Sequence, residues 1–186
     1  MKLIYMIPFL ALCVPQAHAI TPDQIINYKD VIEDRRVHSD YAKGNLYSVG
    51  KYGMTTAQLS EVGLLNTDMN SGAEWNDAKV VVKSNQFGIT DLQSFLKNVN
   101  AQSYYADRYL TLEAHKMSPD TFEYNVITPR EYRDIFPHGI KLTPNSMALC
   151  IWNLNGQVCE KFIKEGTTGE KRIDAYMLSQ ILPYQL

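Results

Sequence analysis

The most regular pattern of apolar and polar positions lies in the middle of the chain. Apolar side chains recur there every three or four residues, with polar side chains between them: Phe95, Val99, Ala106, Leu110, Ala114 and Met117. Such spacing places them on one face of an α-helix. Thr90 and Gln93 form a capping-box pattern at its start. We therefore predict a helix over residues 91–116.

A second helical pattern begins near residue 21. Thr21 can cap a helix, and Pro22 fits a first helical turn. Three of the apolar side chains that follow share one face: Ile25, Tyr28 and Ile32. The pattern predicts a helix that ends near Glu33.

The C-terminal part of the chain predicts three more helices. Thr143 and Pro144 begin the first of them, whose inward face is apolar at Met147, Ile151 and Leu154. The second covers about 157–165 and ends at Gly166. The third covers about 172–182 and turns four side chains inward: Ile173, Tyr176, Met177 and Ile181.

The segment after the first helix is less regular. Residues 34–53 are polar and contain several glycines, so we expect a loop with a short hairpin around 46–52. A short helix then begins at residue 55 or 56, buries Leu59 and Val62, and ends at Gly63.

Two further segments complete the pattern. Residues 80–82 are all valine and fit either a strand or a buried turn of helix. Residues 118–146 contain four prolines, which favours a loop with one short helix near 130–135. The sequence contains no internal repeat or linker. We therefore predict a mainly α fold, with at most a small hairpin, and a single domain over residues 20–186.

Residues 1–19 have the pattern of a signal peptide. Lys2 supplies a positive charge, residues 3–14 are mostly apolar, and Ala17-His18-Ala19 is a small-x-small cleavage site. The apolar run is short for a membrane span, and an N-terminal anchor is the alternative. We expect a mature chain that begins at Ile20, is periplasmic or secreted, and has no membrane contact after cleavage.

Charge and composition narrow the classes of partner. The 186-residue chain has a formal net charge of −2, which becomes −3 when Lys2 is removed with the signal peptide. No basic face is evident, which argues against a nucleic-acid partner. Twelve tyrosines can stack on sugars, although most tyrosines in proteins are packing residues. The mature histidines lack metal-ligand spacing, so we expect no metal and no cofactor: His38, His115 and His138.

Cys150 and Cys159 are the thiols of the expected mature chain. Export permits a disulfide between them. Along one unbroken helix nine residues rise about 13.5 Å, whereas bridged Cα atoms lie within about 7 Å of each other. A bridge therefore requires a helix break, which Asn153, Asn155 and Gly156 can supply. We predict the bridge, with two free thiols as the alternative.

Glu33 is the candidate catalytic acid. Cleavage of a glycosidic bond needs a proton on the leaving oxygen, and a carboxylic acid supplies it at neutral pH when burial raises the pKa of the acid. Glu33 stands where an apolar helix face meets a polar loop, which can shield one side of the carboxyl and open the other. A glutamate in such a position is more often simply solvated.

A larger set of residues resembles a known family. Its members, in chain order, are Ile32-Glu33, Tyr41, Asn45, Gly50-Lys51-Tyr52-Gly53-Met54, Trp75, Gly88-Ile89-Thr90, Phe95-Leu96, Asn98, Ala101-Gln102, residues 146–156 and Asp174-Ala175-Tyr176-Met177. Their order resembles that of lysozyme-like and lytic-transglycosylase-like domains, closest to those attached to phage tail and secretion-system proteins. The resemblance covers most of the mature chain and implies a lysozyme-like fold.

The resemblance also implies a peptidoglycan-cleaving glycosidase that acts on glycan strands with Glu33 as general acid. The residues implied to line its cleft are Tyr41, Asn45, Tyr52 and Gly53. A muramidase needs a second carboxylate, for which Asp40 is the best placed, although a turn-capping role is more common for such an aspartate. A lytic transglycosylase needs one acid, because a hydroxyl of the sugar attacks, and is the simpler interpretation.

Four departures from the family pattern leave other functions open, one of which is a slightly long gap between Glu33 and Gly50. Gly53 stands where the family has glutamine, Asp34 where it has a small residue, and residues 151–156 replace a His-Leu-Gly-Gly-like segment. One alternative is an inactive peptidoglycan-binding module of a secretion or wall-remodelling assembly. The other is a secreted antibacterial effector whose partner is an immunity protein.

Overall fold

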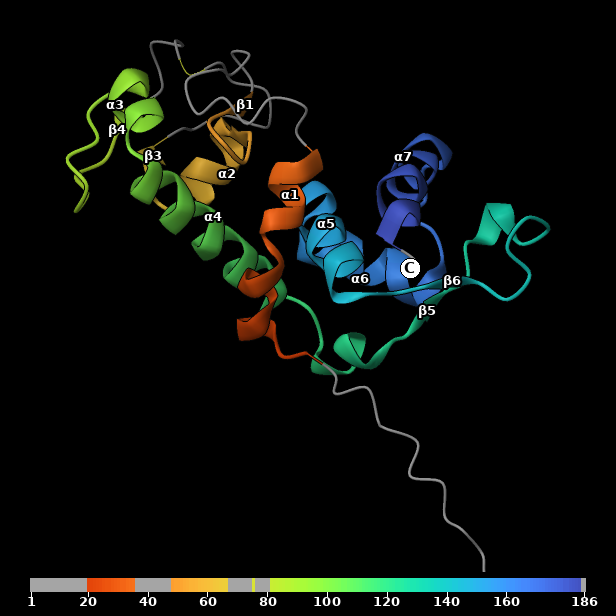
Figure 1. Ribbon diagram of the computed structural model, residues 1–186. Coiled ribbons are helices and arrows are strands. Elements are labelled where there is room, and N and C mark those ends of the chain that lie inside the picture. The colour runs from red at the N-terminus through yellow and green to blue at the C-terminus, as the bar shows by residue number, and fades with distance from the viewer. Residues whose placement is uncertain (1–19, 36–47, 67–74, 76–80, 185–186) are drawn as a thin grey trace, which may run out of the picture.

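The computed structural model describes residues 20–35, 48–66, 75 and 81–184, without the side chains of Asp34 and Arg35. The predicted signal peptide, residues 1–19, lies outside these ranges. The described chain is mainly helical, with short two-stranded sheets (Figure 1). The helical expectation is therefore confirmed, and the strands exceed the single hairpin that the sequence predicts.

The centre of the molecule is α4 (Val99–Ala114), against which the N-terminal elements pack. The chain enters through the 3-10 helix η1 (Pro22–Tyr28), continues into α1 (Asp30–Arg35), and η1 contacts both α4 and α5. In Figure 1 these segments, in red and orange, run between α4 and α5. One side of α4 is buried along its length, so segments from both ends of the chain share its surface.

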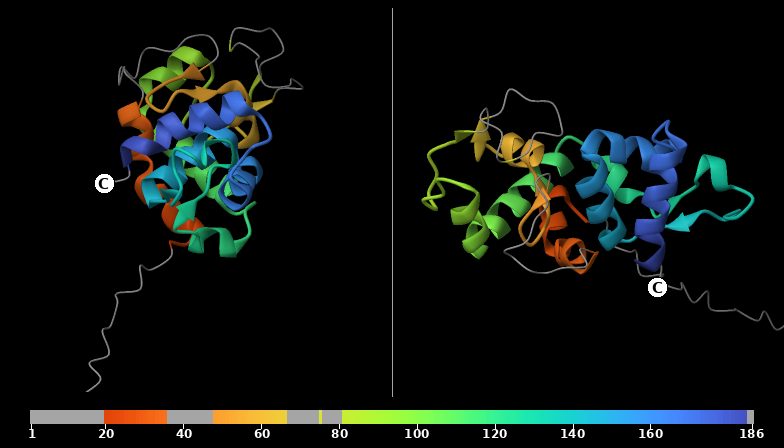
Figure 2. Two further views of the ribbon diagram at one scale, coloured as in Figure 1. Left: turned by 90° about the vertical axis from the view of Figure 1, so that its right-hand side faces the viewer. Right: turned by 90° about the horizontal axis from the view of Figure 1, so that it is seen from above.

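The elements at one end of α4 are small. They are β1 (Ser48–Val49), β2 (Met54–Thr55), α2 (Thr56–Glu61), β3 (Leu65–Asn66), β4 (Val81–Val82) and α3 (Leu92–Lys97). β1 and β2 pair antiparallel with Val49 opposite Met54, and β3 and β4 pair antiparallel with Leu65 opposite Val82. Figure 2 shows these elements toward one end of the molecule, away from the C-terminal helices.

The other end is built from the C-terminal half of the chain. Its elements are η2 (Pro119–Glu123), β5 (Val126–Ile127), η3 (Arg130–Tyr132), β6 (Ile140–Lys141), α5 (Pro144–Leu154), α6 (Gly156–Glu165), α7 (Lys171–Ile181) and η4 (Leu182–Tyr184). β5 and β6 pair antiparallel. α5 packs against α6, α7, η1 and α1, so it joins the C-terminal helices to the N-terminal ones.

The predicted long helix over 91–116 is wrong, because the chain breaks at Asn98. Asn98 has an extended backbone, and its side-chain oxygen accepts a hydrogen bond from the Ala101 N–H, which caps a new helix. The preceding helix α3 is capped by Asp91 with Ser94, rather than by Thr90 with Gln93. Val99, on the first turn of α4, is exposed. It therefore does not belong to a buried face that continues from α3, as the predicted single helix requires.

The N-terminal half holds two further corrections. Residues 22–35 are not one helix, because the 3-10 segment η1 ends before α1 begins. The described part of the expected hairpin covers Ser48–Thr55 and so extends beyond the predicted end at residue 52, with the glycines Gly50 and Gly53 in its turn. The helix expected after Thr55 is confirmed as α2, capped by Thr55 with Gln58.

The three helices predicted in the C-terminal part of the chain are confirmed. α5 begins after Thr143 and buries Met147, Ile151 and Leu154, and α6 ends at Gly166, as predicted. α7 is also confirmed, although Tyr176 points outward and is exposed. The β5–β6 hairpin was missed, because its strands have two residues each and carry no alternation that periodicity can detect.

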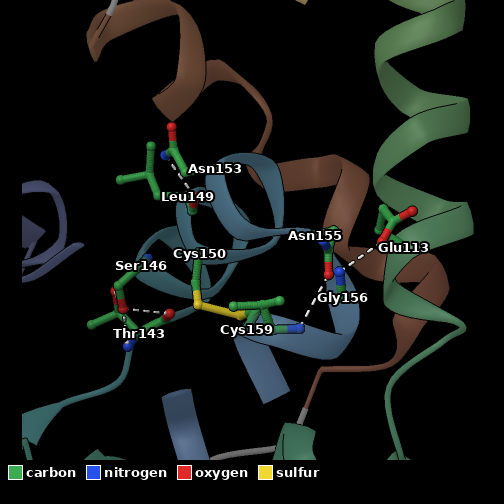
Figure 3. Close-up of a disulfide and its surroundings, with 10 residues drawn as sticks. Glu113, Thr143, Ser146, Leu149, Cys150, Asn153, Asn155, Gly156 and Cys159 are labelled. Carbon is green, nitrogen blue, oxygen red and sulfur yellow. Dashed lines mark hydrogen bonds between the residues drawn. A yellow bond between two sulfur atoms is a disulfide. The ribbon is translucent and has the colours of Figure 1, made fainter. Parts of the chain in front are cut away.

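Cys150 and Cys159 form a disulfide, as predicted, with their Cα atoms 5.5 Å apart. The helix break that the bridge requires falls at Asn155, whose positive φ of 64° separates α5 from α6. Figure 3 shows the bridge closing the angle between these two helices. Both cysteines are buried, so the bridge is part of the core between α5 and α6.

Candidate functional site

Glu33 lies in the last turn of the short helix α1. The two residues before it, Val31 and Ile32, are buried and fix this helix on the core. The Glu33 side chain itself is 23% exposed. The structure therefore places this carboxyl at the boundary between core and solvent, as its sequence position predicts.

The carboxylate of Glu33 is paired with Lys51. Its Oε2 atom lies 2.5 Å from the Lys51 Nζ atom, and the Lys51 side chain is 16% exposed. Lys51 comes from the β1–β2 turn, so two segments separated in sequence meet at this ion pair. Sequence reasoning missed the pair, although both residues belong to motifs that it had selected.

The turn that carries Lys51 is held by Gln102 of α4. Gln102 is buried, its Oε1 atom accepts the Lys51 N–H at 2.7 Å, and its Nε2 atom donates to the carbonyls of Phe95 and Leu96 at 3.1 and 3.0 Å. Gly50 has a φ of +74°, and a Cβ there would meet Gln102 Oε1 at 2.5 Å. The close approach explains why glycine occupies this position.

Tyr52 is a core residue, which corrects the expectation that it contacts substrate. Its side chain is 2% exposed, and its ring lies 6.4 Å from that of Trp152. The ammonium groups of Lys51 and Lys29 lie 5.4 and 6.0 Å from the ring centroid. Tyr52 therefore packs between the turn and the core, and it presents almost no surface to a ligand.

Lys29 and Lys51 differ in their anionic partners. The Lys29 Nζ atom lies 2.6 Å from Asp107 Oδ1 and donates to Ser103 Oγ at 2.8 Å, both on α4. Lys51 instead reaches Glu33. The two lysines thus approach the same tyrosine ring but belong to different ion pairs.

The other predicted site residues have different outcomes. Gly53 is buried in the hairpin turn with a φ of +59°, and its N–H donates to the Gly50 carbonyl at 2.9 Å. It has no side chain to offer a ligand. The predicted catalytic Asp40 and the predicted cleft residues Tyr41 and Asn45 lie outside the residues that the structure describes.

A second group of carboxylates lies farther along α4. Glu113 is fully buried and accepts the Gly156 N–H at 2.6 Å, and Lys116 pairs with both Glu113 and Glu61. Glu113 is eleven residues beyond Gln102 on α4, which is about 16 Å along the helix axis. The group therefore lies well along α4 from the Gln102 side chain that holds the Lys51 turn.

The ionisation of this carboxylate group follows from its contacts. Burial raises the pKa of Glu61, and a hydrogen bond with Glu113 raises it further. For Glu113 burial acts in the same direction, but the contacts with Glu61, the Gly156 N–H and Lys116 outweigh it and lower the pKa. Glu113 is thus ionised more readily than Glu61, and it joins α4 to the start of α6 (Figure 3). We interpret the group as a structural connection.

Residues 151–156, which depart from the family pattern, are mostly buried, with Asn155 exposed. Trp152 is buried against Tyr52 and Tyr109, and its Nε1 atom has no hydrogen-bond partner within the described chain. Gly156 approaches α4 so closely that a Cβ would lie 2.0 Å from the Glu113 carbonyl oxygen. The segment therefore anchors α5 and α6 on α4.

Shallow hollows open on the surface that the described residues form. One hollow is lined by residues of the 87–100 segment, and another by Gly63, Asn85, Tyr104, Arg108 and their neighbours. Neither includes Glu33 or Lys51. Over the described ranges, no three acidic, histidine or cysteine side chains gather as metal ligands would, and no helix has the length and apolarity to traverse a bilayer.

Comparisons of the chain with protein-family models, with curated proteins and with solved structures find no match. The site must therefore be interpreted from its own chemistry. A carboxyl at the edge of the core, with one oxygen on an ammonium group and part of its surface open, can accept and donate a proton at a ligand.

Proposed function

We propose that this protein has a lysozyme-like fold and is an exported, peptidoglycan-cleaving glycosidase with Glu33 as its general acid. The observation that carries the proposal is the position of Glu33. Its carboxyl lies at the boundary of a mainly helical core, 23% exposed, beside a hairpin turn that α4 holds in place. The order of the family-like residues along the sequence adds support.

The proposed reaction begins with proton transfer from Glu33 to the oxygen that leaves. The bond between this oxygen and the sugar carbon then breaks through an oxocarbenium-like transition state. In a lytic transglycosylase a hydroxyl of the same sugar attacks and returns its proton to the Glu33 carboxylate. We favour this chemistry because it needs one acid, and the predicted second carboxylate, Asp40, lies outside the residues that the structure describes.

The proposal predicts that Glu33→Gln abolishes turnover of purified cell walls while the fold is kept. A glutamine fills the same space but cannot donate a proton, and loss of a general acid lowers rates by about 10²–10⁴-fold. Release of soluble fragments measures the activity, and circular dichroism measures the fold. Glu165→Gln, at an exposed position on α6, is the control and should keep full activity. Equal activity of Glu33→Gln and wild type would end the proposal.

A peptidoglycan-binding module without catalysis is the second candidate. Two observations favour it: Gly53 offers no side chain where the family has a polar one, and Lys51 occupies an oxygen of Glu33. The same wall preparation separates the two functions. A binding module would sediment with the walls and release no fragments from them.

A further inference from the structure

The ion pair between Glu33 and Lys51 conflicts with the acid role of Glu33. A general acid must carry a proton on the oxygen that meets the substrate, whereas Lys51 Nζ lies 2.5 Å from that carboxylate. Both side chains are mostly buried, at 23% and 16% exposure. Breaking a mostly buried ion pair without replacing it is costly. A new anion for Lys51 would remove most of this cost.

Lys51 is placed for such an exchange. Its backbone is fixed, because Gln102 accepts its N–H and the Gly50–Gly53 hydrogen bond closes the turn. Its ammonium group sits at the end of a flexible four-carbon chain beside the Tyr52 ring. Lys29, the other cation near this ring, is already bound by Asp107 and Ser103. Lys51 is therefore the cation at this site whose anionic partner is the proposed acid.

We propose that Lys51 determines specificity by binding a carboxylate of the substrate, and that this exchange releases Glu33 for catalysis. The inference rests on the proposed function. The carboxylates carried by the peptide stems of peptidoglycan match the group that Lys51 now holds, so the exchange replaces one ion pair by another of the same kind. A neutral glycan offers no such replacement and leaves Glu33 paired.

The proton balance of the exchange is simple. Lys51 stays an ammonium group and moves from the Glu33 carboxylate to the substrate carboxylate. Glu33 takes a proton from solvent and donates it to the glycosidic oxygen as the bond to carbon breaks. The attacking hydroxyl then returns a proton to Glu33. Glu33 releases this proton to solvent as Lys51 pairs with it again, so the enzyme leaves the cycle unchanged.

The test compares two forms of one substrate: soluble glycan–peptide strands, and the same strands with their free carboxylates converted to methylamides. We expect the wild type to cleave the amidated strands at least tenfold more slowly, as a ratio of kcat/KM. Lys51→Met should cleave both forms at similar rates, and the amidated form at least as fast as the wild type does. Lys51→Arg, which keeps the charge, should restore part of the preference.

Lys29→Met is the matched control, because Lys29 lies near the same ring but is not bound to Glu33. It should keep the wild-type ratio, and thermal melts verify that each variant is folded. Equal cleavage of both forms by the wild type, or an unchanged ratio in Lys51→Met, would overturn the inference while the proposed function stands. Absence of cleavage of either form by the wild type would instead remove the proposed function and this inference together.

Discussion

Glu160 of α6 shows how strongly a carboxylate can be held when several donors surround it. It accepts hydrogen bonds from the Ser118 N–H at 3.2 Å and the Thr121 hydroxyl at 3.1 Å, and it lies 2.8 Å from Lys164 Nζ. Burial alone would raise its pKa, but Lys164, Ser118 and Thr121 together lower the pKa to about 2. The charged form of Glu160 therefore stabilises the attachment of η2 to α6.

The pKa of Glu160 predicts how stability changes with pH. Because the pKa is lower in the folded chain than its usual 4.5, the stabilisation is present above pH 4.5 and is lost as the pH falls toward 2. We expect Glu160→Gln to lower the free energy of unfolding by about 2 kcal/mol at pH 7, and by little at pH 2.5. Urea titrations at the two pH values measure the difference.

The control for this variant is Glu165→Gln, at an exposed position on the same helix. Its effect on the free energy of unfolding should stay below about 0.5 kcal/mol at either pH. A loss in Glu160→Gln that is the same at both pH values would contradict the assignment of the stabilisation to its ionised form.

Individual residues also mark the limit of the sequence interpretation. The sequence selected Glu33 and the Gly50–Met54 string as parts of one resemblance, and the structure brings Glu33 and Lys51 into contact. The ion pair with Lys51 was not predictable, because it depends on the register of a hairpin with two-residue strands. Tyr52 was misassigned for a related reason: hairpin geometry, which the sequence does not reveal, turns its ring into the core.

Among the elements, the β1–β2 hairpin is tied to α4 by the Gln102 side chain. Gln102 joins its turn to α4 and to the end of α3 through three hydrogen bonds. Removal of this buried amide breaks all three bonds, although the Phe95 carbonyl keeps the Asn98 N–H as a partner. The geometry of Lys51 at the site is thus set by a residue in another helix.

We therefore expect Gln102→Leu to lower the free energy of unfolding by about 2–3 kcal/mol, since buried polar groups without partners are costly. Denaturant titration at an unchanged m-value measures this loss. Gln93→Leu, at an exposed position on α3, should change stability by less than about 0.5 kcal/mol. A similar effect of both substitutions would mean that the Gln102 contacts contribute little.

The α5–α6 pair is the element that the sequence predicted best. Helix caps, the break near Asn155 and the bridged cysteines all carry local signals. The break at Asn98 gave a conflicting signal instead, because apolar residues continue the helical spacing through it. The Asn98 side chain caps a new helix at this point, and the spacing of apolar residues alone does not detect such a cap.

Reduction of the disulfide tests the contribution of this pair to stability. The bridge closes a short loop with a sequence separation of 9 residues, for which loop-closure entropy predicts about 2–3 kcal/mol. The reduced wild-type chain should therefore unfold at a lower denaturant concentration than the oxidised chain. Reduction replaces no side chain, so the difference does not include the effect of a substitution on packing. Mass spectrometry follows the state of the thiols. Identical transitions in both states would contradict the predicted contribution.

At the scale of the whole molecule, α4 connects the β1–β2 hairpin to the C-terminal helix α6. Its first turns hold the hairpin beside Glu33 through Gln102, and its last turn holds α6 through Glu113. The helical class was predictable from periodicity. The arrangement of the helices around α4 was not, because it depends on contacts such as Gln102 and Glu113 that link residues far apart in sequence. The proposed acid is therefore positioned by the whole fold rather than by its own short helix.

The central claim is that Glu33 donates the proton that cleaves glycan strands. The most direct test is mass spectrometry of the soluble fragments released from purified walls by the wild type and by Glu33→Gln. We predict that the wild type releases muropeptides with anhydro ends, lighter by one water than hydrolysis products, and that Glu33→Gln releases none. Walls left intact by the wild type, or the same fragments from both proteins, would contradict the account.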